Sequence, residues 1–156
     1  MTVVDLGAAP GGWSQVCSEI VDSGKILSLD LKKIDKIKNV SILERNFLEE
    51  KSKKKVLAFF EKKIDLIISD MAANTTGNKA LDCIRTNQLC TDVINYSSEI
   101  LKPEGVLVSK VFMGEDFIET KNLAKSKFKK VQFFKPESSR NESKETYLHC
   151  SILKTL

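Results

Sequence analysis

The sequence predicts an α/β fold in which helices cover both faces of a mostly parallel, seven-stranded sheet. Short β-branched stretches alternate with longer helical patterns from the first residue to the last, which is typical of a parallel sheet wrapped by helices. The chain has 156 residues, a length that suits one domain. Its 42% hydrophobic and 29% charged residues can fill a core and cover a surface, a balance that argues against wholesale disorder and fibrous repeats.

The predicted strands are short and rich in β-branched residues. In chain order they are Thr2–Leu6, Ile26–Leu31, Val40–Arg45, Ile64–Ser69, Val106–Phe112, Val131–Lys135 and Tyr147–Leu153. Helical patterns fill the longer intervals, over Trp13–Val21, Lys51–Lys62, Ala80–Leu101 and Phe117–Phe128. A glycine-rich turn opens the first helix. The third has apolar residues at helical spacing, and Lys102-Pro103-Glu104-Gly105 is typical of a helix end.

The chain carries 25 Lys and Arg against 21 Asp and Glu, a net charge of +4. The excess lies mostly in lysine runs, at Lys32-Lys33, Lys53–Lys55 and Lys129-Lys130, so local basic patches matter more than the total. No apolar stretch approaches the ~18 residues that cross a bilayer, and the first residues lack a signal-peptide pattern. We therefore expect a cytoplasmic protein without membrane association.

The cysteines do not form a metal-binding pattern. The four of them, at positions 17, 83, 90 and 150, include no C-x-x-C pair, and His149 is the only histidine. A zinc cluster would lack ligands at workable spacing. We expect no metal, and reduced, buried thiols; Cys83 and Cys90, seven residues apart, would share one helix face in the core.

A glycine-rich turn, Gly7-Ala8-Ala9-Pro10-Gly11-Gly12, follows the first predicted strand and opens a helix. Backbone amides at such a turn face the carboxyl edge of the sheet, where α/β proteins bind ligands. Asp30 lies near the end of the second predicted strand, 18 residues after Gly12 (30 − 12), close to the ~20-residue offset at which an acid binds ribose hydroxyls. The pattern favours a nucleoside-bearing cofactor over NAD. A tight turn without a ligand would explain the glycines but not Asp30.

Lys110 is the most informative charged residue. Strand alternation places it on one face with Val106, Val108 and Phe112, so its ammonium must reach a carboxylate, a cleft or the end of the strand. Two acids, Asp70 and Glu145, also lie at predicted strand ends. A solvated strand end would account for either acid alone, and less well for both together with Lys110.

One long polar stretch, Pro136–Lys144, separates the last two predicted strands. Such a loop is either a mobile hairpin tip or a binding loop. Composition alone slightly favours the first.

Four segments together resemble one protein family. They are Val3–Gln15, Ser69-Asp70-Met71-Ala72, Lys110-Val111-Phe112, and Lys135–Arg140 continuing to Glu145-Thr146-Tyr147. On these residues the chain resembles FtsJ/RrmJ-type ribosomal RNA 2′-O-methyltransferases over its whole length. The resemblance implies a Rossmann-like methyltransferase fold, S-adenosylmethionine as cofactor, and methylation of the ribose 2′-hydroxyl of a uridine in large-subunit ribosomal RNA.

The resemblance also implies roles for individual residues. The family's catalytic group is a Lys-Asp-Lys-Glu tetrad, whose last three members match Asp70, Lys110 and Glu145. Its cofactor-contacting positions match Gly11, Trp13, Asp30 and Asp70, and Asn46 is expected to contact the cofactor at one further position. RNA contacts are expected from Ser139, Arg140 and Lys144 on the polar loop, with ribosomal RNA or the large ribosomal subunit as partner and a monomeric enzyme.

Three departures from the family pattern stand out. The first lysine of the tetrad has no counterpart, because in the family it lies in a helical segment before the first strand, where this sequence begins. We therefore expect residues 1–156 to form a methyltransferase domain without the family's N-terminal segment. Asn46 stands where the family usually has an acid beside the adenine, and Ala73 replaces a proline.

The residue types suit this chemistry. A 2′-hydroxyl is a poor nucleophile, so its attack on a sulfonium methyl needs close contact and a group that accepts the proton. Lysine can accept the proton only if desolvation or a second cation lowers its pKa. A missing partner lysine therefore affects both the pKa and the orientation of Lys110. Asp70–Ala73 lacks the Pro-Pro-aromatic stretch of methyltransferases that act on amino groups. The sequence also has no Pro-Cys pair to serve as the nucleophile for C5 methylation of a pyrimidine.

Other readings stay open at this stage. The chain could be a truncated or inactive relative that binds only cofactor or RNA. The missing lysine supports this interpretation, whereas Lys110 and Glu145 argue against it, because a domain that only binds does not need them. It could methylate another RNA, such as tRNA. A nicotinamide-dependent oxidoreductase rests on the fold alone.

Overall fold

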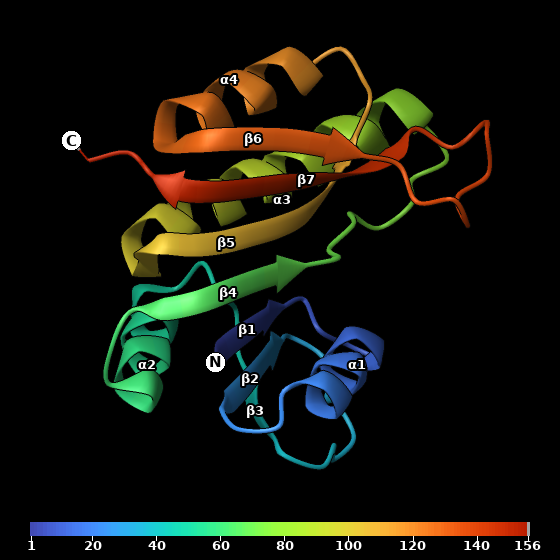
Figure 1. Cartoon of the computed structure of the whole chain (residues 1–156). Helices are drawn as coiled ribbons and strands as arrows, with labels where there is room; N and C mark the ends of the chain where they lie inside the picture. Colours follow the sequence, from blue (N-terminus) through green and yellow to red (C-terminus); the bar gives the residue numbers. More distant parts are fainter. Residues whose placement is uncertain (156) are drawn as a thin grey trace.

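The computed structural model describes residues 1–155, which form seven strands and four helices (Figure 1). The strands are β1 Thr2–Leu6, β2 Lys25–Asp30, β3 Val40–Glu44, β4 Ile64–Ser69, β5 Leu101–Phe112, β6 Phe128–Phe134 and β7 Glu145–Leu153. The helices are α1 Gly12–Ile20, α2 Glu50–Phe60, α3 Lys79–Ile100 and α4 Phe117–Lys127. Every predicted element is present.

The strands form one sheet in the order β3-β2-β1-β4-β5-β7-β6. Neighbours from β3 to β5 are parallel, whereas β7 runs antiparallel to both β5 and β6. The predicted, mostly parallel sheet is therefore confirmed. The direction of winding reverses between β1 and β4, and open α/β sheets bind ligands beside such a reversal, at the carboxyl ends of the strands.

Helices pack on both faces of the sheet, as predicted. On one face the larger core joins strand residues such as Val4 to Val56 of α2, Ile94 of α3 and Ala124 of α4. On the other face a smaller core around Val3 packs against α1. Since neighbouring residues of a strand point to opposite faces, Val3 and Val4 belong to different cores.

The sheet face against which α1 packs is covered over only part of its width. This helix contacts β1, β2 and β3. Farther along the same face, Val106, Val108, Lys110 and Phe112 of β5 stay partly exposed, while the residues between them are buried. The alternation predicted for this strand is confirmed, and Lys110 lies on its less covered side.

Two boundaries differ from the prediction for identifiable reasons. Lys102–Gly105 does not follow α3 as a loop but lies within β5, where the register with β4 shifts between Ile64 and Leu66. The strand resumes its pairing at Val106. At one edge of the sheet, β6 begins at Phe128, earlier than predicted, because Phe128 pairs with Leu153 of β7 and its side chain is buried in the core.

Candidate active site

A pocket of about 410 Å³ opens at the carboxyl ends of β1, β2 and β4. Three of the predicted cofactor-binding residues line it, namely Asp30, Asn46 and Asp70. Its apolar lining includes Leu29, Leu31, Phe47, Leu48, Met71 and Leu89. The two other predicted residues, Gly11 and Trp13, lie on the α1 side of the turn and are not among the lining residues.

The glycine-rich turn needs glycine at two positions. Gly7 has φ +68°, and a Cβ there would overlap the side chain of Met71. Gly11 is the N-cap of α1 with φ +117°, and a Cβ there would come within 2.8 Å of Ile37 Cδ1. Both positions combine a left-handed backbone with close contact, so any other residue would be strained. Gly11 therefore shapes the turn between β1 and α1.

Asp30 ties the turn to β2. Its Oδ2 accepts a hydrogen bond from Ala9 N at 2.9 Å, and its Oδ1 accepts one from Lys32 N at 2.7 Å. A carboxylate has about four acceptor sites, so two remain for a ligand in the pocket. Asn46 is also engaged, because its Oδ1 accepts from Leu48 N at 3.0 Å.

The three predicted catalytic residues meet at the neighbouring strand ends. Lys110 Nζ lies 3.1 Å from Asp70 Oδ1 and 3.5 Å from Glu145 Oε2. The lysine side chain is 11% exposed, whereas the two acids are about one-third exposed, at 35% and 32%. Within residues 1–155, Lys110 is the only cation in an ion pair with either acid. The amine therefore sits between two carboxylates, next to the pocket that Asp70 also lines.

The pairing of β7 with β5 explains why Glu145 lies next to Lys110. The antiparallel register between β5 and β7 pairs Phe112 with Glu145 and Lys110 with Tyr147. Directly paired residues point to the same face of a sheet. Glu145, Lys110 and Tyr147 consequently converge on one side, although 35 residues (145 − 110) separate the acid from the lysine in the sequence.

Tyr147 is a member of this cluster that sequence reasoning did not assign. Its hydroxyl donates to Asp70 Oδ1 at 2.6 Å and lies 3.4 Å from Glu145 Oε1. Burial raises the pKa of Tyr147, and its bond to the Asp70 carboxylate raises it further. The phenol thus stays protonated and acts as a donor. The available signal was its position two residues after Glu145 in one strand, which predicts a shared face.

A buried hydrogen-bond network of three side chains lies below the glycine-rich turn. Asp5 is 1% exposed, and its Oδ2 accepts from Ser14 Oγ at 2.6 Å. That hydroxyl is also 2.6 Å from Ser28 Oγ, so the network links β1, α1 and β2. Burial raises the pKa of Asp5 to about 6 against the opposing effect of the Ser14 bond, and the carboxylates of Asp70 and Asp30 add to the rise.

Two residues of α3 fix the segments that carry the predicted catalytic side chains. The buried Asn87 holds the end of β5, because its Nδ2 donates to Phe112 O at 2.9 Å and its Oδ1 accepts from Phe112 N at 2.7 Å. Thr86 Oγ1 accepts from Ala73 N at 3.1 Å, three residues after Asp70. Proline has no N–H to donate, so Ala73 makes a contact that proline at this position would lose.

The expected RNA-binding residues Ser139, Arg140 and Lys144 lie on the loop between β6 and β7. Lys135 holds this loop, since its Nζ donates to Asn141 O at 3.2 Å and to Ser143 O at 2.6 Å. Lys144 O accepts from Met113 N at 2.8 Å, which joins the loop to the end of β5. The loop therefore borders the predicted catalytic cluster. It also lies beside the segment that follows β4, because Ala72 and Ala73 line one pocket with Glu142, Ser143 and Lys144 (Figure 1).

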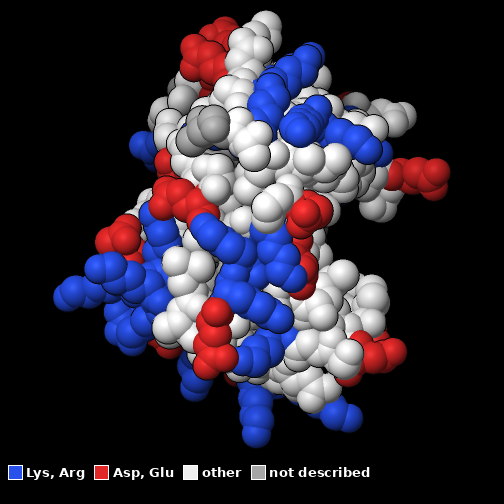
Figure 2. All heavy atoms as spheres, turned by 60° about the vertical axis from the view of Figure 1, so that its left-hand side comes forward, with Lys and Arg blue, Asp and Glu red and all other residues white. Residues whose placement is uncertain are grey.

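Not all lysine runs lie near this edge. Figure 2 shows Lys and Arg side chains gathered on the side of the molecule that is on the left in Figure 1, where the lysine-rich helix α2 lies. The carboxyl ends of β1 and β4, next to the predicted catalytic residues, are on the right in Figure 1. The run Lys53–Lys55 belongs to the distant side, and Lys53 is paired there with Glu99 at 2.6 Å.

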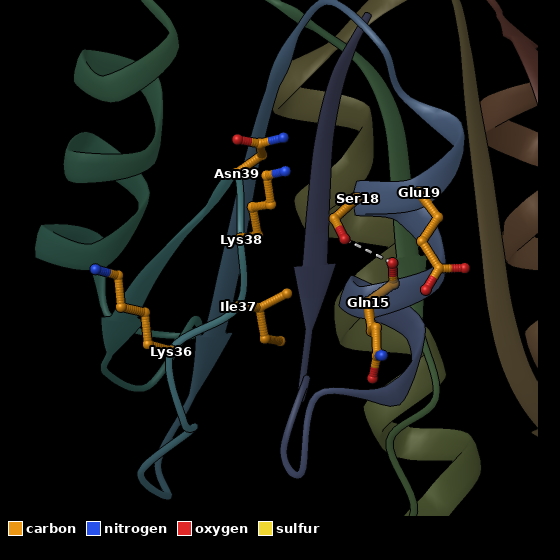
Figure 3. A pocket seen from close by; sticks show the side chains of 7 residues that line it. All are labelled: Gln15, Ser18, Glu19, Lys36, Ile37, Lys38 and Asn39. Carbon is orange, nitrogen blue, oxygen red and sulfur yellow. Dashed lines mark hydrogen bonds between the residues drawn. The ribbon is translucent and has the colours of Figure 1, made fainter.

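A second hollow lies between α1 and the segment before β3. Its lining consists of Gln15, Ser18 and Glu19 of α1 and of residues 36–39, with Lys36 directed away from α1 (Figure 3). Its volume is about 500 Å³, somewhat larger than the first pocket. None of the predicted catalytic or cofactor-binding residues lines it, so size alone does not identify the active site.

The cysteines take no part in the site. All four are free, and three are buried as predicted, while Cys17 is half-buried. Burial raises the pKa of Cys90 and of Cys150 to about 12, which leaves almost no reactive thiolate. Among residues 1–155 no group of three His, Cys, Asp or Glu side chains could hold a metal ion, and no described helix is long and apolar enough to cross a membrane.

Comparison with known proteins gives consistent matches. The profile of the FtsJ-like methyltransferase family matches residues 1–152. The chain is 46% identical to a ribosomal RNA large subunit methyltransferase E of Pelagibacter ubique, over 99% of this chain and 76% of that protein. It is 45% identical to the protein of the same name from Rickettsia akari, over 95% of this chain and 68% of that protein. A crystal structure assigned to a ribosomal RNA methyltransferase of Plasmodium falciparum superposes with a TM-score of 0.86 at 27% identity, over 97% of this chain and 86% of that one.

Proposed function

The chain belongs to the FtsJ-like methyltransferase family, and on that premise we propose that it transfers a methyl group from S-adenosylmethionine to the ribose 2′-hydroxyl of a uridine in large-subunit ribosomal RNA. The relatives named large subunit methyltransferase E support the RNA class. The observation that carries the proposal is the Lys110 amine between Asp70 and Glu145, beside a pocket that Asp70 shares with Asp30.

The pocket residues fit S-adenosylmethionine. Leu31, Phe47 and Leu48 provide apolar walls suited to an adenine ring, and Asp30 retains acceptor sites for ribose hydroxyls. Asp70 adds negative charge, which suits a cationic ligand. When bound, the cofactor supplies an electrophilic methyl group on a sulfonium. Gly11 and Trp13 would contribute from the α1 side of the turn.

The cluster's own residues can position the hydroxyl and move its proton. We infer that Lys110 Nζ, in its neutral amine form, holds the ribose 2′-hydroxyl and accepts its proton as the methyl carbon forms a bond to the hydroxyl oxygen and loses its bond to the cofactor sulfur. Asp70 and Glu145 would stabilise the resulting ammonium, because their oxygens lie 3.1 Å and 3.5 Å from Nζ. Tyr147 donates to the same Asp70 oxygen, which holds that carboxylate in place.

RNA would approach over the loop between β6 and β7. Arg140 and Lys144 are exposed there, and Lys144 directly precedes Glu145. Cationic side chains next to a reacting ribose would hold its phosphates and set the register of the strand. Ser139 would add a hydroxyl donor. The monomeric state stays a prediction, and a ribosomal RNA substrate agrees with the cytoplasmic location expected from the sequence.

The direct test is to incubate the protein with labelled S-adenosylmethionine and three RNA preparations: large-subunit ribosomal RNA, assembled large subunits and bulk tRNA. Methylated nucleotides are then mapped by their resistance to alkaline hydrolysis, which distinguishes ribose from base methylation. We expect a single 2′-O-methyluridine in large-subunit RNA. Label only in tRNA would change the substrate, and cofactor binding without transfer to any RNA would identify a binding-only relative.

A further inference from the structure

An aromatic row on the partly covered face of the sheet leads from the glycine-rich turn to solvent. The ring centroids of Trp13 and Tyr147 are 5.4 Å apart, and those of Tyr147 and Phe134 are 5.7 Å apart with planes inclined by 23°. Strand register extends the row to the catalytic lysine, because Tyr147 pairs with Lys110 on β5 and with Phe134 on β6. One row therefore contains a catalytic amine, a buried phenol and an outer phenyl ring.

Phe134 is exposed where the rest of its strand face is polar. Side chains at alternate positions of β6 share a face, and the two preceding residues on that face, Lys130 and Gln132, are exposed. Phe134 is 46% exposed although its neighbour in the row, Tyr147, is only 8% exposed. An aromatic ring at this position adds little to the core, so its placement next to the catalytic cluster needs another explanation.

The surroundings of Phe134 suit an RNA strand. A cleft of about 490 Å³ is lined by Phe134 together with Met113, Glu145 and the two lysines 135 and 144. The aromatic and the methionine supply flat and adaptable apolar surface, while the lysines supply positive charge for phosphates. Because Glu145 belongs to the same lining, the cleft adjoins the cluster of Lys110, Asp70 and Glu145.

We propose that Phe134 is a stacking platform for an unpaired base of the RNA, at or next to the nucleotide that is methylated. The inference rests on the proposed function and deepens it: the enzyme would require a single-stranded or splayed-out target. Proteins read unpaired nucleotides by stacking bases on aromatic rings, and a paired base inside a duplex offers no free face for this contact.

The test measures binding of the full chain to two fluorescent probes at one salt concentration. The first is a short single-stranded oligouridylate, and the second is a strand of the same length with abasic riboses. Phe134→Ala should weaken oligouridylate binding roughly 5- to 150-fold, the range expected for a lost base–aromatic stack. The same substitution should leave binding of the abasic strand unchanged, since only its phosphates and sugars are held.

Three further variants separate stacking from packing. Phe134→Leu keeps apolar bulk against Tyr147 and should lose affinity as Phe134→Ala does, whereas Phe134→Trp should retain it. Ile118→Ala, which removes a 65% exposed aliphatic side chain from α4, is the matched control and should bind both probes normally. Affinity for S-adenosylmethionine, measured for every variant, reports whether the fold and the cofactor pocket are intact.

Each alternative has its own result. Equal weakening for the oligouridylate and the abasic strand, or wild-type behaviour of Phe134→Leu, would overturn the stacking role. Unchanged binding in all variants would also overturn it and would point to a protein segment that covers the ring. If Phe134→Ala shows the stacking pattern but the wild-type chain methylates no RNA, the proposed reaction fails and the platform stands. If the wild type methylates RNA and Phe134→Ala has an unchanged KM for it, the platform fails alone.

Discussion

The exchange Asp5→Asn should stabilise the fold at neutral pH and give a smaller benefit in acid. Burial raises the pKa of Asp5 from 3.8 to about 6. An acid whose pKa is raised by folding binds protons more readily in the folded state than in the unfolded one. The free energy of unfolding therefore falls as the pH rises from the unfolded-state pKa to the folded-state pKa. At neutral pH the protein therefore keeps a buried charge that asparagine does not have.

The size of this effect follows from the shift. Each pKa unit corresponds to about 1.4 kcal/mol, so a rise of about two units destabilises the wild type by about 3 kcal/mol at neutral pH. Part of this difference is already present near pH 4.5, which leaves a change of about 2 kcal/mol between pH 4.5 and pH 7.5. Asparagine can still accept from Ser14 through its side-chain oxygen, so the hydrogen-bond network below the turn is retained.

Urea denaturation of both proteins at these two pH values measures the difference. We expect the stability advantage of Asp5→Asn to grow with pH. Asp22→Asn, which changes an exposed acid near the end of α1, is the control and should show little dependence on pH. An advantage for Asp5→Asn that stays constant, or that shrinks as pH rises, would refute the assignment of Asp5 as a buried charge.

Three further predictions concern the site. Tyr147→Phe should lower the methyl-transfer rate roughly 10- to 100-fold with unchanged cofactor affinity, because it removes one charge-assisted hydrogen bond to Asp70; a single-turnover rate equal to that of the wild type would exclude a positioning role. Asp30→Ala should weaken S-adenosylmethionine binding by roughly 1–3 kcal/mol, and calorimetry that finds unchanged affinity would remove Asp30 from the cofactor site. Arg140→Ala should flatten the slope of log K against log salt for single-stranded RNA by about 0.7, whereas an unchanged slope would return Arg140 to the solvated surface.

The fold could be predicted because its strands are short β-branched runs separated by clear helical patterns. Val106–Phe112 is an example: its alternation predicted which side chains share a face, and the structure confirms it. The extension of β5 back to Leu101 could not be predicted, because Pro103 and Gly105 resemble a helix end. They lie in a register shift instead, which depends on the pairing with β4.

For the candidate site, sequence motifs predicted residues that the structure brings together, Asp70, Lys110 and Glu145, but not their contacts. Nothing local to Asp30 indicates that it accepts from Ala9 N, because that bond requires the folded turn. Tyr147 was visible only as part of a motif, since its bond to Asp70 joins two strands that are separated by β5 in the sheet. The exposure of Phe134 likewise depends on which sheet face the helices leave partly open.

The central claim is that Lys110, held between Asp70 and Glu145, accepts the proton of the reacting hydroxyl. The most direct measurement is the single-turnover rate of methyl transfer by Lys110→Ala and Lys110→Arg, with cofactor affinity measured on the same preparations. Both variants should lose transfer by roughly 10²- to 10⁴-fold and still bind S-adenosylmethionine. Arginine cannot replace the lysine because its guanidinium stays protonated. Transfer by Lys110→Arg at the wild-type rate would contradict the claim, and an equal loss of binding and turnover in Lys110→Ala would assign Lys110 to a structural ion pair.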